Sequence, residues 1–248
     1  MGRALFHKNT NNRKTGKTNQ RNTSKSKTTT SRKTISKKNN DIDTKVFALG
    51  GLNEIGKNMY CIEHDNELFI IDAGVKFAEE GLPGIEYVIP DYSYLKKNEK
   101  KIRGLMITHG HEDHIGGIPF LLQVVKIPFI YATPLASAMI KRKLDEKRLT
   151  NVTKIIQIND EYQIKSKYFN IGFFKTNHSI PESMGIIINS PNGRIVETGD
   201  FKFDLSPVGD VADYQKMSFL GETGVTLLMS DSTNSEVPTF SISEKKVA

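Results

Sequence analysis

Three of the six histidines of this 248-residue chain fall in one short segment, His109-Gly110-His111-Glu112-Asp113-His114. The segment follows Gly104 to Thr108, an apolar run that predicts a buried strand. A single histidine at such a place would be interpreted as a polar loop residue. Four ligand-type side chains within six positions instead favour a metal site, and one segment could serve two ions. These side chains belong to His109, His111, Asp113 and His114.

The cysteine count limits the kind of metal site. Cys61 is the only cysteine, which excludes an internal disulfide and a cysteine-rich structural zinc site. Imidazole and carboxylate ligands without thiolate suit zinc, manganese or iron rather than a structural zinc knuckle. We therefore expect a metal held by histidine and carboxylate side chains.

Two further ligand candidates lie downstream, each just after a predicted strand. His178 follows the alternating run Tyr168 to Thr176, and Asp200 comes after a hairpin strand. Either residue alone is an ordinary loop feature. What makes each a ligand candidate is the recurrence of ligand-type side chains at the ends of predicted strands. The two histidines left over, His7 and His64, are predicted to be solvated.

The apolar runs between residues 45 and 229 alternate between strand and helix patterns. Strands interleaved with helices, with some hairpins, predict an α/β fold of mixed sheets covered by helices. The predicted helices are residues 91–101, 115–125 and 135–149. The predicted strands are residues 45–49, 59–63, 68–71, 104–108, 128–132, 154–158 and 168–176, a hairpin over 185–197, and a last buried strand over 225–229.

The first 40 residues differ in charge from the rest of the chain. They carry twelve Lys or Arg and no acid, whereas the remainder has 23 basic and 28 acidic residues, a net charge of −5. Half of the 40 are Ser, Thr, Asn or Gln, which predicts a disordered basic tail over residues 1–43. Three interpretations of the tail stay open, in this order: a solvated segment, an arm that binds nucleic-acid phosphates, and a transit peptide.

The candidate ligands also carry a resemblance to a known family. The segment His109 to His114, together with His178, Asp200 and the upstream Ile71-Asp72-Ala73-Gly74, resembles the metallo-β-lactamase superfamily. Within it, three further stretches are similar to the ribonuclease J family of the beta-CASP branch, and the similarity runs from about residue 46 to the end. These stretches are Leu49 to Met59, Thr198 to Asp204 and Ser230 to Asn234.

The resemblance implies a metallo-β-lactamase αβ/βα sandwich with two divalent metal ions, zinc or alternatively manganese. The ligands that it implies for the first ion are His109, His111 and His178. Those for the second ion are Asp113 and His114, with Asp200 bridging the two ions. It places Asp72 behind the ligands, where its carboxylate would orient them. The catalytic carboxylates implied by the resemblance are those of Asp72, Asp113 and Asp200.

The activity implied by the resemblance is that of a metal-dependent ribonuclease in RNA processing and decay. It would cleave phosphodiesters as a 5′-to-3′ exonuclease and as an endonuclease, with a water shared by the two ions as nucleophile. One alternative is another hydrolase of the superfamily, such as a glyoxalase-II-like thioester hydrolase or a transfer-RNA 3′-processing nuclease. Another is an inactive fragment that binds RNA through its tail.

The family pattern is matched only in its N-terminal part, which predicts an incomplete sandwich. We expect a tail over residues 1–43, the first part of the metallo-β-lactamase domain over 44–229, and the start of a beta-CASP domain over 230–248, opened by Asp231. We consider three explanations of this partial match, in this order: a truncated product, a chain completed by a second polypeptide, and a small variant that works alone.

The expected partner is RNA, since the implied substrate is a phosphodiester chain. The family also implies a homo-oligomer, and a second chain could supply the missing part. No apolar run approaches the roughly 18 residues that cross a bilayer, and no secretory signal is visible. We therefore expect a cytoplasmic protein without a membrane partner.

Overall fold

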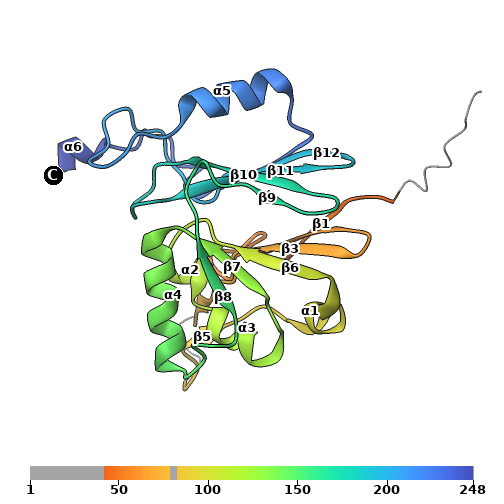
Figure 1. Ribbon diagram of the computed structural model, residues 1–248. Helices are drawn as coiled ribbons and strands as arrows, with labels where there is room; N and C mark the ends of the chain where they lie inside the picture. Colours follow the sequence, from red (N-terminus) through yellow and green to blue (C-terminus); the bar gives the residue numbers. More distant parts are fainter. Residues whose placement is uncertain (1–41, 79–82, 248) are drawn as a thin grey trace, which may run out of the picture. The chain divides into compact units, whose positions relative to one another are not determined.

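The structure is a computed structural model that describes residues 42–78 and 83–247 (Figure 1). The predicted disordered tail, residues 1–43, falls almost entirely outside these ranges, and so does His7. The fold is therefore described from β1 onward.

Six strands form the first sheet, in the order β1-β2-β3-β6-β7-β8. The pairs β1/β2 and β2/β3 are antiparallel, whereas β3, β6, β7 and β8 run parallel to one another. Parallel neighbours need crossover connections, and helices provide them here. The strands are β1 Lys45–Gly50, β2 Met59–His64, β3 Glu67–Ile71, β6 Ile102–Met106, β7 Phe129–Ala132 and β8 Lys154–Gln157.

A second sheet has the order β13-β12-β11-β10-β9, antiparallel except for the parallel pair β12/β13. Its strands are β9 Ile164–Lys165, β10 Asn170–Lys175, β11 Met184–Ser190, β12 Gly193–Glu197 and β13 Leu227–Met229. A small separate hairpin pairs β4 Lys76–Phe77 with β5 Tyr87–Val88.

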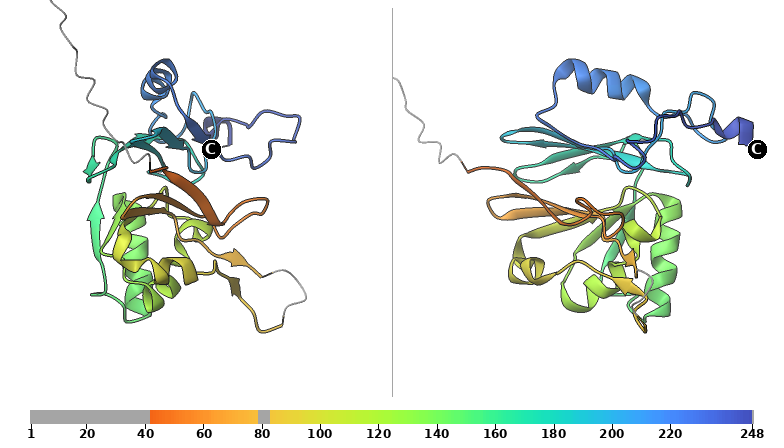
Figure 2. Two further views of the ribbon diagram at one scale, coloured as in Figure 1. Left: turned by 90° about the vertical axis from the view of Figure 1, so that its right-hand side faces the viewer. Right: turned by 180° about the vertical axis from the view of Figure 1, so that it is seen from behind.

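Helices cover the outer faces of both sheets. Figures 1 and 2 show α1, α3 and α4 against the first sheet and α5 against the second, so that helix, sheet, sheet and helix follow one another. This arrangement is the αβ/βα sandwich that the family resemblance implies. The helices are α1 Ser93–Lys97, α2 Glu112–Ile115, α3 Ile118–Val124, α4 Pro134–Glu146, α5 Tyr214–Thr223 and α6 Glu244–Val247, and a 3-10 helix spans Glu99–Lys101.

The alternation of side chains along the strands explains the layers. In β3, Leu68 and Ile70 belong to the core beneath the helices, whereas Phe69 and Ile71 belong to the core between the two sheets. β11 repeats this pattern, with Ile187 in a third, small core on the α5 side. Because successive side chains point to opposite faces, a continuous apolar strand is stable only where both faces are covered.

Two helical predictions differ from the structure. The helix predicted over residues 115–125 is the shorter α3, with Pro119 in its first turn, while Ile115 ends the separate helix α2, which was not predicted. The helix α5 was not predicted, because only Met217 and Leu220 of it join an apolar core and the hydrophobic stripe is short. Its start is stabilised by Asp213, whose side chain accepts a hydrogen bond from the Lys216 N–H at 2.9 Å.

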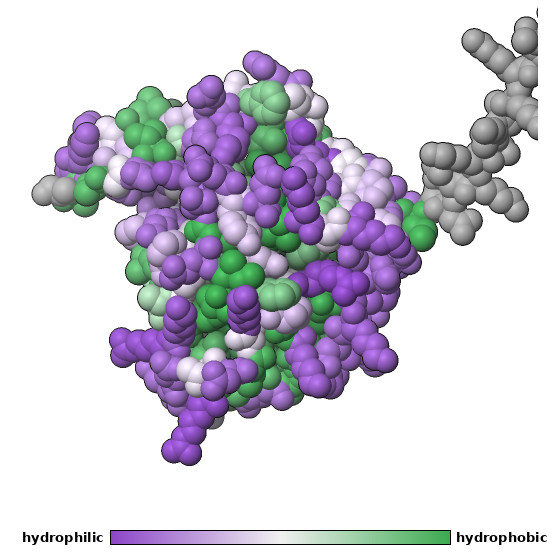
Figure 3. All heavy atoms as spheres, viewed as in Figure 1, coloured by the Kyte–Doolittle hydropathy of each residue, from purple (hydrophilic) through white to green (hydrophobic). Residues whose placement is uncertain are grey.

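The last predicted strand is present, but the prediction that it is buried is wrong. Leu228 of β13 is 61% exposed, because β13 pairs only with β12 within the described ranges and forms an edge of the sheet. Beyond β13, apolar side chains such as Phe240, 99% exposed, remain at the surface. Figure 3 shows hydrophilic side chains over most of the face in view, with smaller hydrophobic patches between them.

Backbone contacts join three segments at one end of the first sheet. Ala73 N donates to His114 O at 2.8 Å, Gly74 N to Asn58 O at 3.0 Å, and Asn58 N to Asp113 O at 3.1 Å. A Cβ atom at Gly74 would lie 1.5 Å from Asp113 O, so only glycine permits this approach. The loops after β3 and before β2 are thereby fixed against α2.

We predict that Gly74→Ala lowers the free energy of unfolding by at least about 2 kcal/mol, because the added methyl group forces the loop and α2 apart. Urea unfolding followed by circular dichroism measures the change. The control is Gly221→Ala in α5, where a Cβ atom meets nothing within 4 Å. Equal stability of the two variants would contradict the tight approach.

Candidate metal centre

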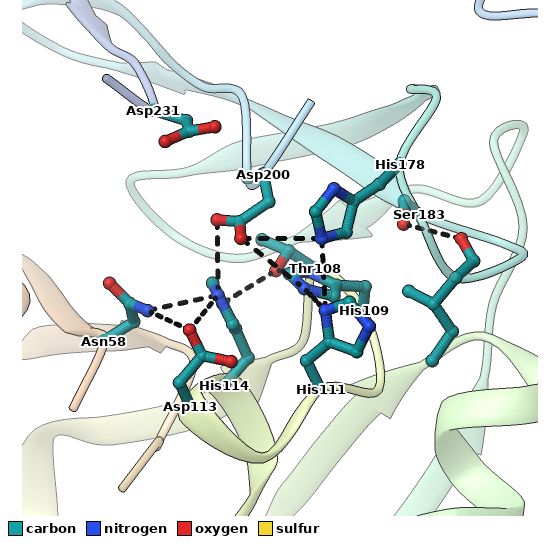
Figure 4. Close-up of polar contacts among 12 residues, drawn as sticks. Asn58, Thr108, His109, His111, Asp113, His114, His178, Ser183, Asp200 and Asp231 are labelled. Carbon is teal, nitrogen blue, oxygen red and sulfur yellow. Dashed lines mark hydrogen bonds and ion pairs between the residues drawn. The ribbon is translucent and has the colours of Figure 1, made fainter. Parts of the chain in front are cut away.

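The histidine segment lies where β6 ends and α2 begins. β6 ends at Met106, His109 lies in the loop that follows, and His111 is the residue directly before α2. Asp113 and His114 lie within this short helix, which turns their side chains toward those of His109 and His111 (Figure 4). The histidine segment therefore follows a buried strand, as the sequence predicts.

Two distant residues of the second sheet reach the same place. His178 follows β10, and Asp200 follows β12. His178 Nε2 is 3.1 Å from His111 Nδ1 and 3.5 Å from Asp200 Oδ2, while Asp200 Oδ1 is 3.3 Å from His114 Nε2. Figure 4 shows both side chains directed at the histidines of the first sheet. All the predicted ligand residues thus converge.

The loops that carry His178 and Asp200 are held by backbone contacts. Lys202 N donates to Asn177 O at 2.8 Å, which ties the two loops together, and Met184 N donates to Thr108 O at 2.9 Å. Gly199 has a φ of 58°, and a Cβ atom there would lie 2.9 Å from Thr108 Cβ. The glycine before Asp200 therefore lets the second sheet approach the end of β6.

The ligand-type atoms form two overlapping groups, within each of which all atoms lie within 4.8 Å of one another. The first group contains His109, His111 and His178, and the second contains His109, His114 and Asp200. Asp113 lies beside the second group, with its Oδ2 3.5 Å from His114 Nε2. Nitrogen and carboxylate donors at this spacing fit zinc or manganese, since both accept imidazole and carboxylate ligands.

Asp72 lies buried behind the histidines. Its Oδ1 accepts a hydrogen bond from Thr108 N at 2.9 Å, and its Oδ2 accepts one from Thr108 Oγ1 at 2.8 Å. Oδ2 is also 2.8 Å from His114 Nδ1, so the carboxylate fixes the orientation of that ring. Asp72 has a φ of 57°, a left-handed conformation that is unfavourable for a residue with a side chain.

Burial and neighbouring charges move the pKa values of the cluster in opposite directions. Burial, with the surrounding imidazoles, lowers the pKa of His109. Burial also opposes the charge of His114, but Asp72 and the other carboxylates around it raise its pKa well above the usual value. His109 is thus neutral and ready to act as a ligand, whereas His114 must lose a proton before it can do so.

Glu197, at the end of β12, is a buried acid that the sequence analysis did not identify. It is 7% exposed, and its Oε2 has no hydrogen-bond partner among the described residues. Burial, together with the negative charges of Asp72 and Asp200, raises its pKa to about 8. Its position at a strand end was visible in the sequence, but its burial depends on the second sheet packing against the first.

A cavity of about 1120 Å³ opens beside the cluster. Its wall includes the loop before β2, residues 51–56 and Asn58, and the segment 230–237 after β13. Asp231 lies on this wall, and its Oδ1 accepts a hydrogen bond from Thr233 N at 2.7 Å. Figure 4 places Asp231 near Asp200 without a contact to the ligand residues.

The prediction for His64 is wrong. Instead of being solvated, His64 is 5% exposed and packs against the rings of Tyr168 and Phe169. Its Nδ1 is 3.0 Å from Thr44 Oγ1. The turn after β2 is covered by the segment that precedes β10. This contact joins distant parts of the sequence, so no local pattern predicts it.

The comparisons with known proteins agree with this fold. The metallo-beta-lactamase superfamily matches residues 52–218, and the chain belongs to this superfamily. Ribonuclease J 1 of Streptococcus pyogenes is 57% identical over 86% of the chain, and Ribonuclease J of Mycoplasma pneumoniae is 46% identical over 82%. Ribonuclease J 2 of Staphylococcus aureus is 42% identical over 86%. The predicted resemblance to ribonuclease J is confirmed.

The match covers only part of these relatives, since the chain spans 38%, 36% and 38% of their respective lengths. Among solved structures, a protein of unknown function from Enterococcus faecalis gives a TM-score of 0.60 at 18% identity, over 80% of this chain and 52% of that one. Human tRNase Z, short form, gives a TM-score of 0.52 at 19% identity, over 82% of this chain and 85% of that one. These two likenesses show the fold.

The described helices are too short to span a membrane. No helix in residues 42–78 and 83–247 is both long and apolar enough to cross a bilayer. The longest, α4 Pro134–Glu146, has 13 residues and packs against the first sheet.

We predict that Glu197→Gln stabilises the metal-free protein more at pH 9 than at pH 5. The carboxyl group stays protonated in the folded state up to a pKa of about 8, so its contribution is complete below the unfolded value of 4.5 and is lost as the pH rises through 8. The amide remains neutral throughout. We expect a difference on the order of 4 kcal/mol between the two pH values, from almost three pKa units at roughly 1.4 kcal/mol each.

Urea unfolding in the presence of a chelator, from pH 5 to pH 9, measures this difference. The matched control is Glu222→Gln, at an exposed position of α5. If the stability curves of wild type and Glu197→Gln stay parallel across this range, the buried acid is not protonated as described.

Proposed function

We propose that this protein is a metal-dependent ribonuclease of the ribonuclease J type, cleaving RNA as a 5′-to-3′ exonuclease and as an endonuclease. The observation that carries the proposal is the convergence of His178 and Asp200 from the second sheet on the histidine segment of the first. The names of the relatives point to RNA as the substrate. Since the chain spans less than two fifths of those relatives, the activity is proposed for it and not carried over as a fact.

The residues proposed to hold the first ion are His109, His111 and His178, whose nitrogens already form one group. Those proposed for the second ion are Asp113, His114 and Asp200. Asp200 has one carboxylate oxygen toward each set, with Oδ2 3.5 Å from His178 Nε2 and Oδ1 3.3 Å from His114 Nε2. A carboxylate in this position is suited to bridge two ions. Zinc, with manganese as the alternative, fits this donor set.

Two divalent cations held there would supply Lewis-acid chemistry that lowers the pKa of water and offsets phosphate charge. The residues of the chain would hold the ions in place and bind the substrate. Asp72 orients His114 and holds the end of β6 in place through Thr108. The cavity beside the cluster would receive the RNA backbone, with the hydroxyl and amide groups of Ser232, Thr233 and Asn234 on its wall.

The alternatives are less well supported. An inactive fragment that binds RNA only through its tail would not need an assembled cluster of histidine and aspartate side chains. A thioester hydrolase has no support among the named relatives, and the tRNase Z structure is similar in fold alone. We also propose residues 44–229 as the first part of the metallo-β-lactamase domain and 230–248 as the start of a beta-CASP domain. A cytoplasmic location, a homo-oligomer and a completing second chain remain predictions.

We predict that Asp200→Ala lowers both the bound metal and the rate of RNA cleavage. The substitution removes the carboxylate that faces both ligand groups, so we expect at least about a thousandfold loss of rate and fewer ions per chain. Hydrolysis of 5′-monophosphorylated RNA and elemental analysis measure the two effects.

The control for this variant is Asp210→Ala, which removes an exposed carboxylate paired with Lys175 outside the cluster. It should retain wild-type metal content and cleavage. Wild-type cleavage by Asp200→Ala at equal metal content would contradict the proposed role. A wild-type protein that binds no metal and cleaves no RNA would contradict the proposed function.

A further inference from the structure

Asn58 contacts the ligand residues of the second ion without being one of the predicted ligands. Its Nδ2 is 3.3 Å from Asp113 Oδ2 and 3.1 Å from His114 Nε2 (Figure 4). Asn58 is partly buried and lies just before β2, on the wall of the cavity. The side chain therefore reaches the cluster from a third segment of the chain, separate from those of His114 and Asp200.

The carboxylate of Asp113 favours the amide nitrogen of Asn58 on its side, with Nδ2 3.3 Å from Asp113 Oδ2. Tyr60 Oη lies 3.3 Å from Asn58 Oδ1 and 3.2 Å from Gly51 O, so its one proton is shared between these two acceptors, and the amide oxygen lies on the side away from Asp113. The opposite orientation would set Oδ1 against the carboxylate of Asp113, where two acceptors repel each other. The backbone of Asn58 is fixed as well, by its bonds to Asp113 O and Gly74 N. The donor is thus held toward the carboxylate.

Asp113 depends on this contact because it lies on a helix of only four residues. Its carboxylate contacts two other side chains, those of Asn58 and His114. His114 is itself a predicted ligand, so its Nε2 would be engaged by the ion. Asn58 remains as the side chain that holds Asp113 whether or not an ion is present. Carboxylate ligands of metals are commonly held by such donors.

We propose that Asn58 is a positioning residue that sets the affinity of the second ion by orienting Asp113. The inference rests on the proposed two-ion centre and adds a residue that determines the affinity of its second ion. Among the described residues, Asn58 Nδ2 lies within hydrogen-bond distance of Asp113 and His114 but not of His109, His111 or His178. The first ion should therefore be unaffected. Loss of a donor to a metal ligand typically costs 10- to 100-fold in metal affinity.

The experiment is a zinc titration in competition with a chromophoric chelator, which resolves the two binding steps without any measurement of activity. We expect Asn58→Ala and Asn58→Leu to weaken the second step by about 10- to 100-fold and to leave the first unchanged. Leucine fills nearly the same space as asparagine, so a role in packing alone would be rescued by Asn58→Leu. Such a rescue would overturn the proposal.

Tyr60→Phe tests the orientation of the amide and leaves Asn58 in place. Without the hydroxyl group, both Asn58 Oδ1 and Gly51 O lose a shared donor, and we expect a weaker second step with a smaller change than in Asn58→Ala. Tighter binding of the second ion in Tyr60→Phe would indicate that the amide oxygen is itself a ligand, and would overturn the positioning role. This variant also keeps the inference testable if Asn58→Ala does not fold.

The matched control is Asn189→Ala, whose amide also makes two hydrogen bonds, to Asn170 O and from Arg194 Nε, but on the second sheet. It should bind both ions as the wild type does. Two ions bound with unchanged affinity in Asn58→Ala and Asn58→Leu would overturn this inference alone. Fewer than two ions in the wild type would overturn the two-ion centre and the inference with it.

Discussion

The carboxylate of Asp72 is the contact on which the rest of the site depends. It accepts hydrogen bonds from the backbone and the hydroxyl group of Thr108 and lies 2.8 Å from His114 Nδ1. One buried side chain thus joins the end of β3 to the end of β6 and orients a histidine of α2. The left-handed backbone of Asp72 is tolerated because these contacts, with the close approach at Gly74, leave the loop no other arrangement.

The electrostatics of the cluster follow from crowding imidazoles and carboxylates into a mostly buried place. Burial pushes His109 toward its neutral form, the carboxylates push His114 toward its charged form, and Glu197 is kept protonated by its surroundings. Burying a neutral histidine, a charged histidine and a protonated acid side by side is costly unless the groups serve a purpose beyond packing. The strain of the arrangement is the physical reason to interpret it as a functional centre and not as a structural one.

Much of the site could be predicted because its candidate ligand residues stand at the ends of strands with clear apolar patterns. His109, His111, Asp113 and His114 are adjacent in sequence, and the loop positions of His178 and Asp200 follow from the strands before them. Asn58 and Glu197 could not be identified, because an amide in a turn and an acid at a strand end are ordinary features. The burial of His64 and the helix α5 were missed because both depend on contacts with distant segments.

The sequence by itself determined the longer strands and the histidine segment, because these are local properties of spacing and side-chain type, whereas the two-residue strands β4, β5 and β9 carry too short a pattern and were not predicted. Only the tertiary structure decided that two sheets pack face to face, so that loops about 70 and 90 residues from His109 meet it at one end. It also decided which neighbours the candidate ligands have, since the environments of Asn58, Asp72 and Glu197 are made by segments that no local pattern connects. The order of side chains along the chain is a property of the sequence, whereas their proximity in space results from packing.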